Sequence, residues 1–178
     1  MLRCGAAGCG FSLLELMLVM ALALTLLAMA LASWRGLLER WTLRTQAQIL
    51  VEDMRYARAQ AIGRAQPVSI CPSVSGSSCA GHVDWASGWL VFLDPDGNRV
   101  VDPGERVLRQ HLPDPALRSM SSNATGRPGL TYQPTGMARA AGQTLRLSGS
   151  GSPPSQRIVC VSMQGRAALQ AEGATSCS

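Results

Sequence analysis

The sequence has few of the residues on which enzyme active sites depend. It contains two histidines, His82 and His111, and neither has the sequence neighbours of a catalytic triad. It has no Gly-x-Ser-x-Gly motif, no phosphate-binding P-loop and no group of metal-ligating residues at zinc spacing. We therefore expect a protein that is not an enzyme and that uses no cofactor.

Lysine is missing altogether, because all 16 basic residues are arginines, and the net charge is +5. The excess of positive charge lies late in the chain, where residues 116–178 hold six arginines and one acidic residue, Glu172. Such an excess can bind phosphate backbones. The alternative is a solvated basic surface without a ligand.

Charge is missing from Leu16 to Ala32, and Thr25 is the only polar side chain in that stretch. From Phe11 to Trp34 the one charged residue is Glu15. About 20 apolar residues in a helix cross a bilayer core, so the segment 11–34 predicts a transmembrane helix. Two alternatives are a secretory signal peptide cut at a small-x-small site in 28–32 and a plain anchor in which Glu15 reaches the interface.

Residues 10–16 read GFSLLEL, which resembles the prepilin cleavage motif of type IV pilins and type II secretion pseudopilins. The resemblance implies that 1–10 is a leader, that a prepilin peptidase cuts between Gly10 and Phe11, and that Phe11 is then N-methylated. It also implies that Glu15 acts in assembly, by pairing with the amino group of a neighbouring subunit. The expected location is the inner membrane, in a single pass with a periplasmic C-terminal domain, and then a filament.

Proline is missing from Leu37 to Ile62, and apolar residues recur there at alternating spacings of four and three. That pattern predicts an amphipathic continuation of the helix over 35–63, ended near Gly63 by Pro67. The predicted buried stripe consists of Leu43, Ala47, Leu50, Met54, Ala57 and Ala61.

Beyond the helix, residues 64–178 form short β-like runs separated by turn-rich segments. We predict one periplasmic β-rich domain, and an α+β pilin fold in which a long N-terminal helix packs on an antiparallel sheet. The predicted strands are Val68–Cys71, Trp89–Leu93, Arg106–Leu112, Leu130–Gln133, Thr144–Leu147 and Arg157–Met163, and the predicted loops are Ser73–Gly81, Ser121–Gly129 and Ser148–Ser155.

Four cysteines remain once the leader is removed: Cys71, Cys79, Cys160 and Cys177. An even number on the far side of a membrane predicts two disulfides. Three pairings are open, of which Cys71–Cys79 with Cys160–Cys177 closes the shortest loops.

The segments 70–73 and 84–94, with Cys79 between them and the acidic stretch up to Arg109 after them, resemble the GspH/FimT family of minor pilins and pseudopilins. The resemblance implies a structural subunit that assembles with other pilins into a type IV pilus or a type II secretion pseudopilus. Trp85 and Trp89 are then expected to be core residues rather than ligand contacts.

FimT-type members are implied to bind double-stranded DNA at the pilus tip during natural transformation, through a C-terminal Gly-Arg-x-Arg motif. Here Gly165 and Arg166 match, whereas the second arginine is replaced by Ala168. The alternative function is therefore a DNA-binding subunit that uses Arg146, Arg157, Gly165 and Arg166.

The acidic stretch Asp94–Glu105 partly fits the sequence template of a calcium-binding loop. Five residues occupy template positions 1, 3, 5, 9 and 12, but Arg99 stands at position 6, where glycine is needed. The alternative is a hairpin turn with solvated carboxylates. The candidate ligands are Asp94, Asp96, Asn98, Asp102 and Glu105.

Overall fold

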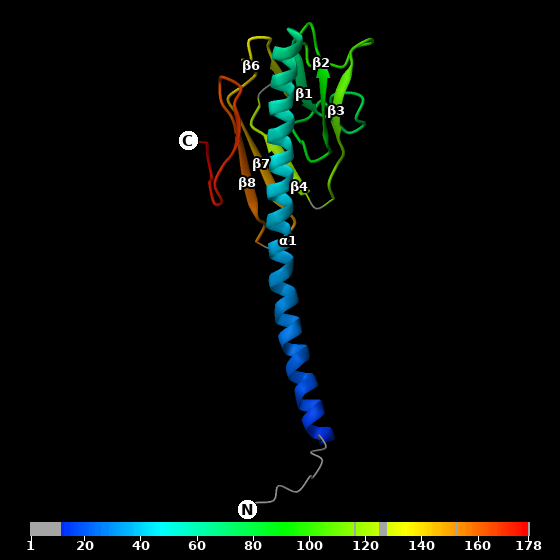
Figure 1. The fold of residues 1–178 in the computed structure, drawn as a ribbon, viewed down its shortest axis with the longest axis vertical. Helices are drawn as coiled ribbons and strands as arrows, with labels where there is room; N and C mark the ends of the chain where they lie inside the picture. Colours follow the sequence, from blue (N-terminus) through cyan, green and yellow to red (C-terminus); the bar gives the residue numbers. More distant parts are fainter. Residues whose placement is uncertain (1–11, 116, 125–127, 152, 178) are drawn as a thin grey trace, which may run out of the picture. The chain divides into compact units, whose positions relative to one another are not determined.

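The computed structural model describes residues 12–115, 117–124, 128–151 and 153–177. Its first element, α1, runs from Leu13 to Arg64 (Figure 1). The helix ends in a Schellman arrangement, since Ala65 has a positive φ of 52° and the N–H of Gln66 donates to the carbonyl of Ala61 at 3.3 Å. Pro67 follows Gln66 directly and cannot continue the helix. Since α1 ends at Arg64, the end predicted near Gly63 is correct to within one residue.

The chain divides into two compact units, Met1–Leu37 and Leu38–Ser178, and we call the second the globular unit. In the first unit, the large apolar side chains between Leu13 and Met29 are 56–79% exposed. Over the described residues, no helix contains a stretch that is long and apolar enough to cross a membrane. The predicted membrane segment 11–34 begins outside the described residues.

The second half of α1 carries the predicted apolar stripe, and all six of its residues are at most 1% exposed. They form a single core with apolar residues of both β-sheets. The tryptophans Trp85 and Trp89, expected to be core residues, are 0% and 2% exposed and belong to that core. The 3.6-residue repeat thus positions the helix on the sheets.

The β-structure is antiparallel, as predicted, and it forms two sheets. The first has the order β3-β2-β1-β5-β6 and the second the order β4-β7-β8-β9. The bounds are β1 Val68–Pro72, β2 Trp89–Leu93, β3 Val107–His111, β4 Leu117–Ser122, β5 Leu130–Tyr132, β6 Ala138–Arg139, β7 Gln143–Gly149, β8 Gln156–Val161 and β9 Ala167–Leu169.

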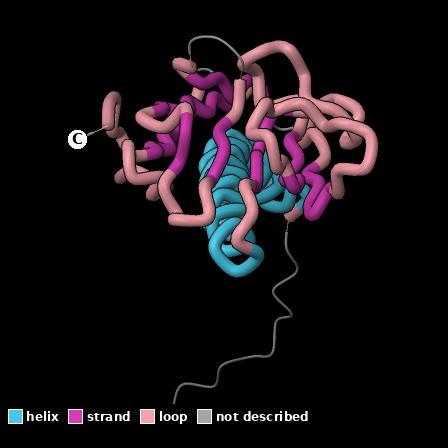
Figure 2. The backbone as a smooth tube through the Cα atoms, turned by 90° about the horizontal axis from the view of Figure 1, so that it is seen from above, coloured by secondary structure: helices cyan, strands magenta, loops and turns pink. Residues whose placement is uncertain are grey.

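In the globular unit, the strands surround the end of α1 on one side, as the view along the helix shows (Figure 2). Alternation along β7 sets which side chains face the helix, since Leu145 and Leu147 are buried and Arg146 between them is exposed. The inner faces of the two sheets and the stripe on α1 therefore share one hydrophobic core.

Candidate functional site

The predicted processing site, Gly10 and Phe11, lies outside the described residues. Glu15 is in the first turn of α1 and is exposed. This position in the first turn suits a carboxylate, because helix N-termini attract negative charge. Processing at Phe11 and the assembly role of Glu15 both stay predictions.

A polar network that the sequence did not reveal fixes α1 to the first sheet. Asp53 of α1 is buried, accepts a hydrogen bond from Nε1 of Trp89 at 2.8 Å and forms an ion pair with Arg109 of β3 at 2.9 Å. The guanidinium of Arg109 also lies 3.7 Å from the ring centre of Tyr56. Asp53 is 36 positions from Trp89 and 56 positions from Arg109 in the sequence. No local sequence pattern could therefore have indicated these contacts.

The four cysteines of 64–178 form two disulfides, Cys71–Cys79 and Cys160–Cys177. Of the three pairings that the sequence left open, this is the one with the shortest loops. The second disulfide ties the chain end to β8. It thereby holds the segment 171–176 beside the second sheet.

The basic residues proposed for DNA binding do not share one surface. Arg146 of β7 pairs with Ile158, whereas Arg157 pairs with Leu147, so the two arginines point to opposite faces of the sheet. Arg157 is 8% exposed and forms an ion pair with Glu172 at 3.1 Å. A phosphate backbone lying along one face could contact only part of the predicted set.

Gly165 and Arg166 form the turn between β8 and β9. Gly165 has a φ of +76°, and a Cβ there would lie 2.9 Å from both Tyr132 Cε1 and Ala138 Cβ. The N–H of Ser162 donates to the carbonyl of Arg166 at 2.9 Å, and the Arg166 side chain is exposed. Turn geometry and close packing are therefore sufficient reasons for the glycine at this position.

The carboxylates of the candidate calcium loop converge. Oxygens of Asp94, Asp96 and Glu105 lie within 4.8 Å of one another. Asn98 donates from its side chain to Asp96 at 2.8 Å and to Asp102 at 2.7 Å.

The loop has two further features that bear on calcium. Arg99, at template position 6, has a φ of +60°, the left-handed conformation for which the template uses glycine. Burial raises the pKa of Asp94, and the charge of Asp96 raises it further. Burial likewise raises the pKa of Glu105, with smaller contributions from the neighbouring carboxylates. Calcium binding here stays a prediction.

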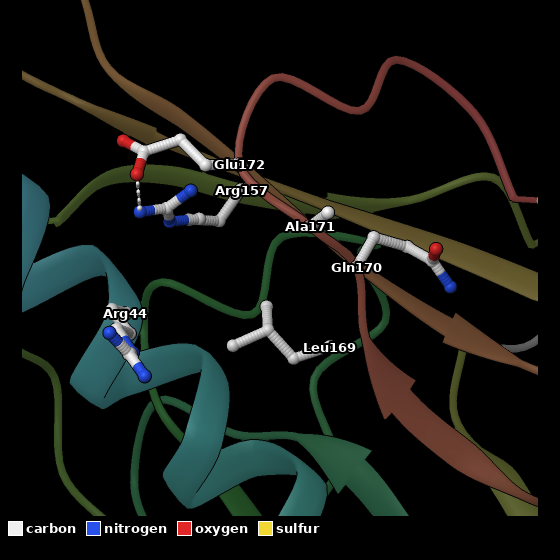
Figure 3. Close-up of a pocket in the computed structure, with 6 residues that line it drawn as sticks. All are labelled: Arg44, Arg157, Leu169, Gln170, Ala171 and Glu172. Atoms are coloured by element: carbon white, nitrogen blue, oxygen red, sulfur yellow. Dashed lines mark ion pairs between the residues drawn. The ribbon is translucent and has the colours of Figure 1, made fainter.

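A pocket of about 340 Å³ opens beside α1, β8 and the segment after β9. Figure 3 shows Arg44 reaching it from the helix and Arg157 from β8, with Glu172 above Arg157. Leu169, Gln170 and Ala171 complete its lining. Two guanidinium groups and one carboxylate thus meet at one cavity, and sequence analysis did not identify it.

Comparisons with known proteins agree on one family. Residues 46–165 match the family described as type II transport protein GspH. Over 166 residues the chain is 32% identical to the pilin-like protein PilA1 of Thermus thermophilus, covering 90% of this chain and 97% of that protein.

Two solved structures have a similar fold. The type IV minor pilin FimU of Pseudomonas aeruginosa gives a TM-score of 0.58 at 20% identity, covering 75% of this chain and 91% of that chain. The minor pseudopilin EpsH of the Vibrio cholerae type 2 secretion system gives 0.52 at 16% identity, covering 74% and 98%.

Proposed function

Because the chain belongs to the GspH family, we propose that it is a minor pilin or pseudopilin, a structural subunit of a type IV pilus or of a type II secretion pseudopilus. The observation that carries this proposal is the exposed apolar surface of α1 between Leu13 and Met29. Continuous apolar surface of this kind needs a partner or a membrane to cover it. In a filament, the equivalent helices of other pilins cover it.

The subunit is made with a leader, residues 1–10, which the prepilin peptidase removes before Phe11 is methylated. Until assembly the apolar segment 11–34 holds the protein in the inner membrane, and the globular unit lies in the periplasm. The GFSLLEL motif and the uncharged run behind it support this pathway. The two disulfides support an oxidising compartment for the globular unit.

Glu15 sets the register between subunits in the filament. A carboxylate among packed apolar helices is costly unless it is paired, and the amino group of a neighbouring Phe11 is a suitable partner. Removing one partner of a buried ion pair costs roughly 3–5 kcal/mol. Loss of Glu15 should therefore block incorporation and leave cleavage unaffected.

The first test is the mass of the mature N-terminus, measured on protein purified from its own membranes. A chain that begins at Phe11 and carries one added methyl group supports the proposal. A chain that begins near Ser33 indicates ordinary secretion and contradicts it.

The second test is the amount of the protein in sheared and sedimented filaments. Glu15→Ala should be processed normally and missing from the filaments. The matched control is Glu52→Ala, which removes an exposed carboxylate from the globular half of the same helix. Equal incorporation of both variants would remove the proposed role of Glu15.

A further inference from the structure

The pocket beside Arg44 and Arg157 has the features of a site for a carboxylate. Arg157 lies on the inner face of the second sheet, where its strand neighbour Leu147 is fully buried. Its side chain is 9% exposed. A guanidinium cannot lose its proton to escape the cost of burial, so it needs an anion beside it.

Glu172 supplies that anion in the isolated chain, at 3.1 Å from Nη2 of Arg157. The two partners differ greatly in exposure, because the side chain of Glu172 is 65% exposed. The Glu172 carboxylate is hydrated even while it is paired, so its return to water costs little, provided that another anion takes its place beside Arg157. Glu172 is therefore a weakly held ligand of a buried cation, and another carboxylate can replace it.

The chain around Glu172 allows this exchange. The N–H of Gln170 donates to the carbonyl of Ile158 at 2.9 Å, which anchors the segment on one side. The Cys160–Cys177 disulfide anchors it on the other. Between these anchors residues 171–173 are exposed, so the Glu172 carboxylate can move into solvent while the sheet stays intact.

Arg44 provides a second cation at the same cavity (Figure 3). It is exposed, and among the described residues no carboxylate lies within ion-pair distance of it. Two guanidinium groups and a single weakly held carboxylate leave the pocket with an excess of positive charge. A carboxylate that enters it and hydrogen-bonds to Arg157 is also attracted by the positive charge of Arg44.

We propose that this pocket binds the carboxylate of an aspartate or glutamate side chain from a neighbouring subunit, and that Glu172 is the internal ligand it displaces. The proposal rests on the proposed function, because a filament supplies the neighbour. The burial of Arg157 favours a side chain over a nucleic acid, since a carboxylate on a flexible stem can enter the cavity and the backbone of a duplex cannot.

The test is a titration of the full chain, purified in a neutral detergent, followed by NMR of the arginine side-chain N–H groups. The probe is N-acetyl-glutamate methylamide, which presents the glutamate carboxylate alone. Glu172→Gln removes the internal competitor and should bind the probe at least tenfold more tightly than the unchanged protein. Adding Arg44→Gln to that variant should reverse the gain.

Arg146→Gln is the matched control, because it removes an exposed arginine from the opposite face of the same sheet. It should leave binding unchanged. An equal loss with Arg146→Gln, or no gain with Glu172→Gln, overturns the proposal. Arg157→Gln should abolish binding of the probe. Since Arg44 is exposed, its variant keeps the test valid even where Arg157→Gln fails to fold.

A parallel titration with inorganic phosphate distinguishes a phosphate ligand from a side-chain carboxylate. Tighter binding of phosphate than of the carboxylate probe rejects a side chain as the ligand. Mature N-terminal mass and filament incorporation of the unchanged protein are measured beside the titration. A chain that is processed and incorporated, but shows no carboxylate site, refutes the pocket and leaves the proposed function standing.

Discussion

At the scale of single residues, Asp53 links the helix to two strands. Its carboxylate accepts from the indole of Trp89 at the start of β2 and from the guanidinium of Arg109 in β3. Trp89 is 2% exposed, so its N–H has no access to water if the carboxylate is removed. An unsatisfied buried donor costs about 1–3 kcal/mol.

We predict that Asp53→Ala lowers the free energy of unfolding by about 1–3 kcal/mol, because it leaves the buried Trp89 N–H without an acceptor. Asp53→Asn keeps an acceptor and should cost less. The measurement is urea unfolding of the full chain followed by tryptophan fluorescence. Glu52→Ala, the exposed neighbour, should stay within about 0.5 kcal/mol of the unchanged protein; a similar loss in both would exclude the network as the cause.

His111 packs in the same region of the core. Its ring stacks on Trp89 with centroids 4.0 Å apart, and its Nε2 lies 3.0 Å from the side-chain oxygen of Gln46. Burial lowers the pKa of His111 below its ordinary value of 6.5, although the charges of Asp53 and Asp114 oppose this shift. The folded state therefore favours the neutral imidazole.

We predict that stability falls as the pH decreases below 6.5 towards the lowered pKa of folded His111. In that window the unfolded chain binds a proton that the folded chain does not, so acid favours unfolding. His111→Gln should make the unfolding free energy less dependent on pH between about 8 and 5. His82→Gln, in an exposed loop, is the control. An unchanged pH dependence in His111→Gln would contradict the assignment.

At the scale of the elements, the amphipathic stripe and the strongest strands could be predicted from the sequence. The run Trp89–Leu93 is apolar and β-branched or aromatic at most positions, and β2 has those same bounds. The strand Leu117–Ser122 is not indicated by the sequence, because it holds three serines and its end overlaps the predicted loop Ser121–Gly129. The short strands β6 and β9 consist of two and three residues and gave no detectable repeat.

The division into two sheets and the pocket could not be predicted, because both depend on contacts between distant segments. The partner of Arg157 is Glu172, which lies beyond β9 and is brought to it by the pairing of β8 with β9. Whether Arg157 faces the helix or the solvent depends on its register with Leu147. The disulfides were easier to predict, since short loops favoured one pairing.

Substitution of Gly165, in the turn between β8 and β9, tests whether this glycine has a structural role. We predict that Gly165→Ala lowers the free energy of unfolding by about 1–2 kcal/mol for the left-handed backbone, and by about 1–3 kcal/mol more for the close contacts with Tyr132 and Ala138. Gly173→Ala is the matched control, since its φ is +82° and a Cβ there meets no atom within 4 Å. It should incur the backbone cost alone. Equal losses, measured by urea unfolding, would show that packing at Gly165 contributes nothing.

At the scale of the whole molecule, the two units differ in what covers their apolar side chains. Every described buried residue of the hydrophobic clusters lies between Leu43 and Ala167, within the globular unit. The described large apolar side chains from Leu13 to Met29 stay more than half exposed. Folding of the globular unit thus draws its hydrophobic free energy from its own residues.

We predict that a chain beginning at Leu38 folds alone, with an unfolding free energy within about 1 kcal/mol of the full chain, because no core residue has been removed. A chain beginning at Val51 loses Leu43, Ala47 and Leu50, all at most 1% exposed, and should not fold. Deleting one buried leucine side chain alone costs about 2–5 kcal/mol, which is comparable with the whole stability of a small domain. Cooperative unfolding, measured by circular dichroism and tryptophan fluorescence, separates the two chains. If the chain from Leu38 also fails to fold, then residues before it contribute to the stability of the globular unit. The exposed apolar surface of α1 could not in that case be reserved for other subunits.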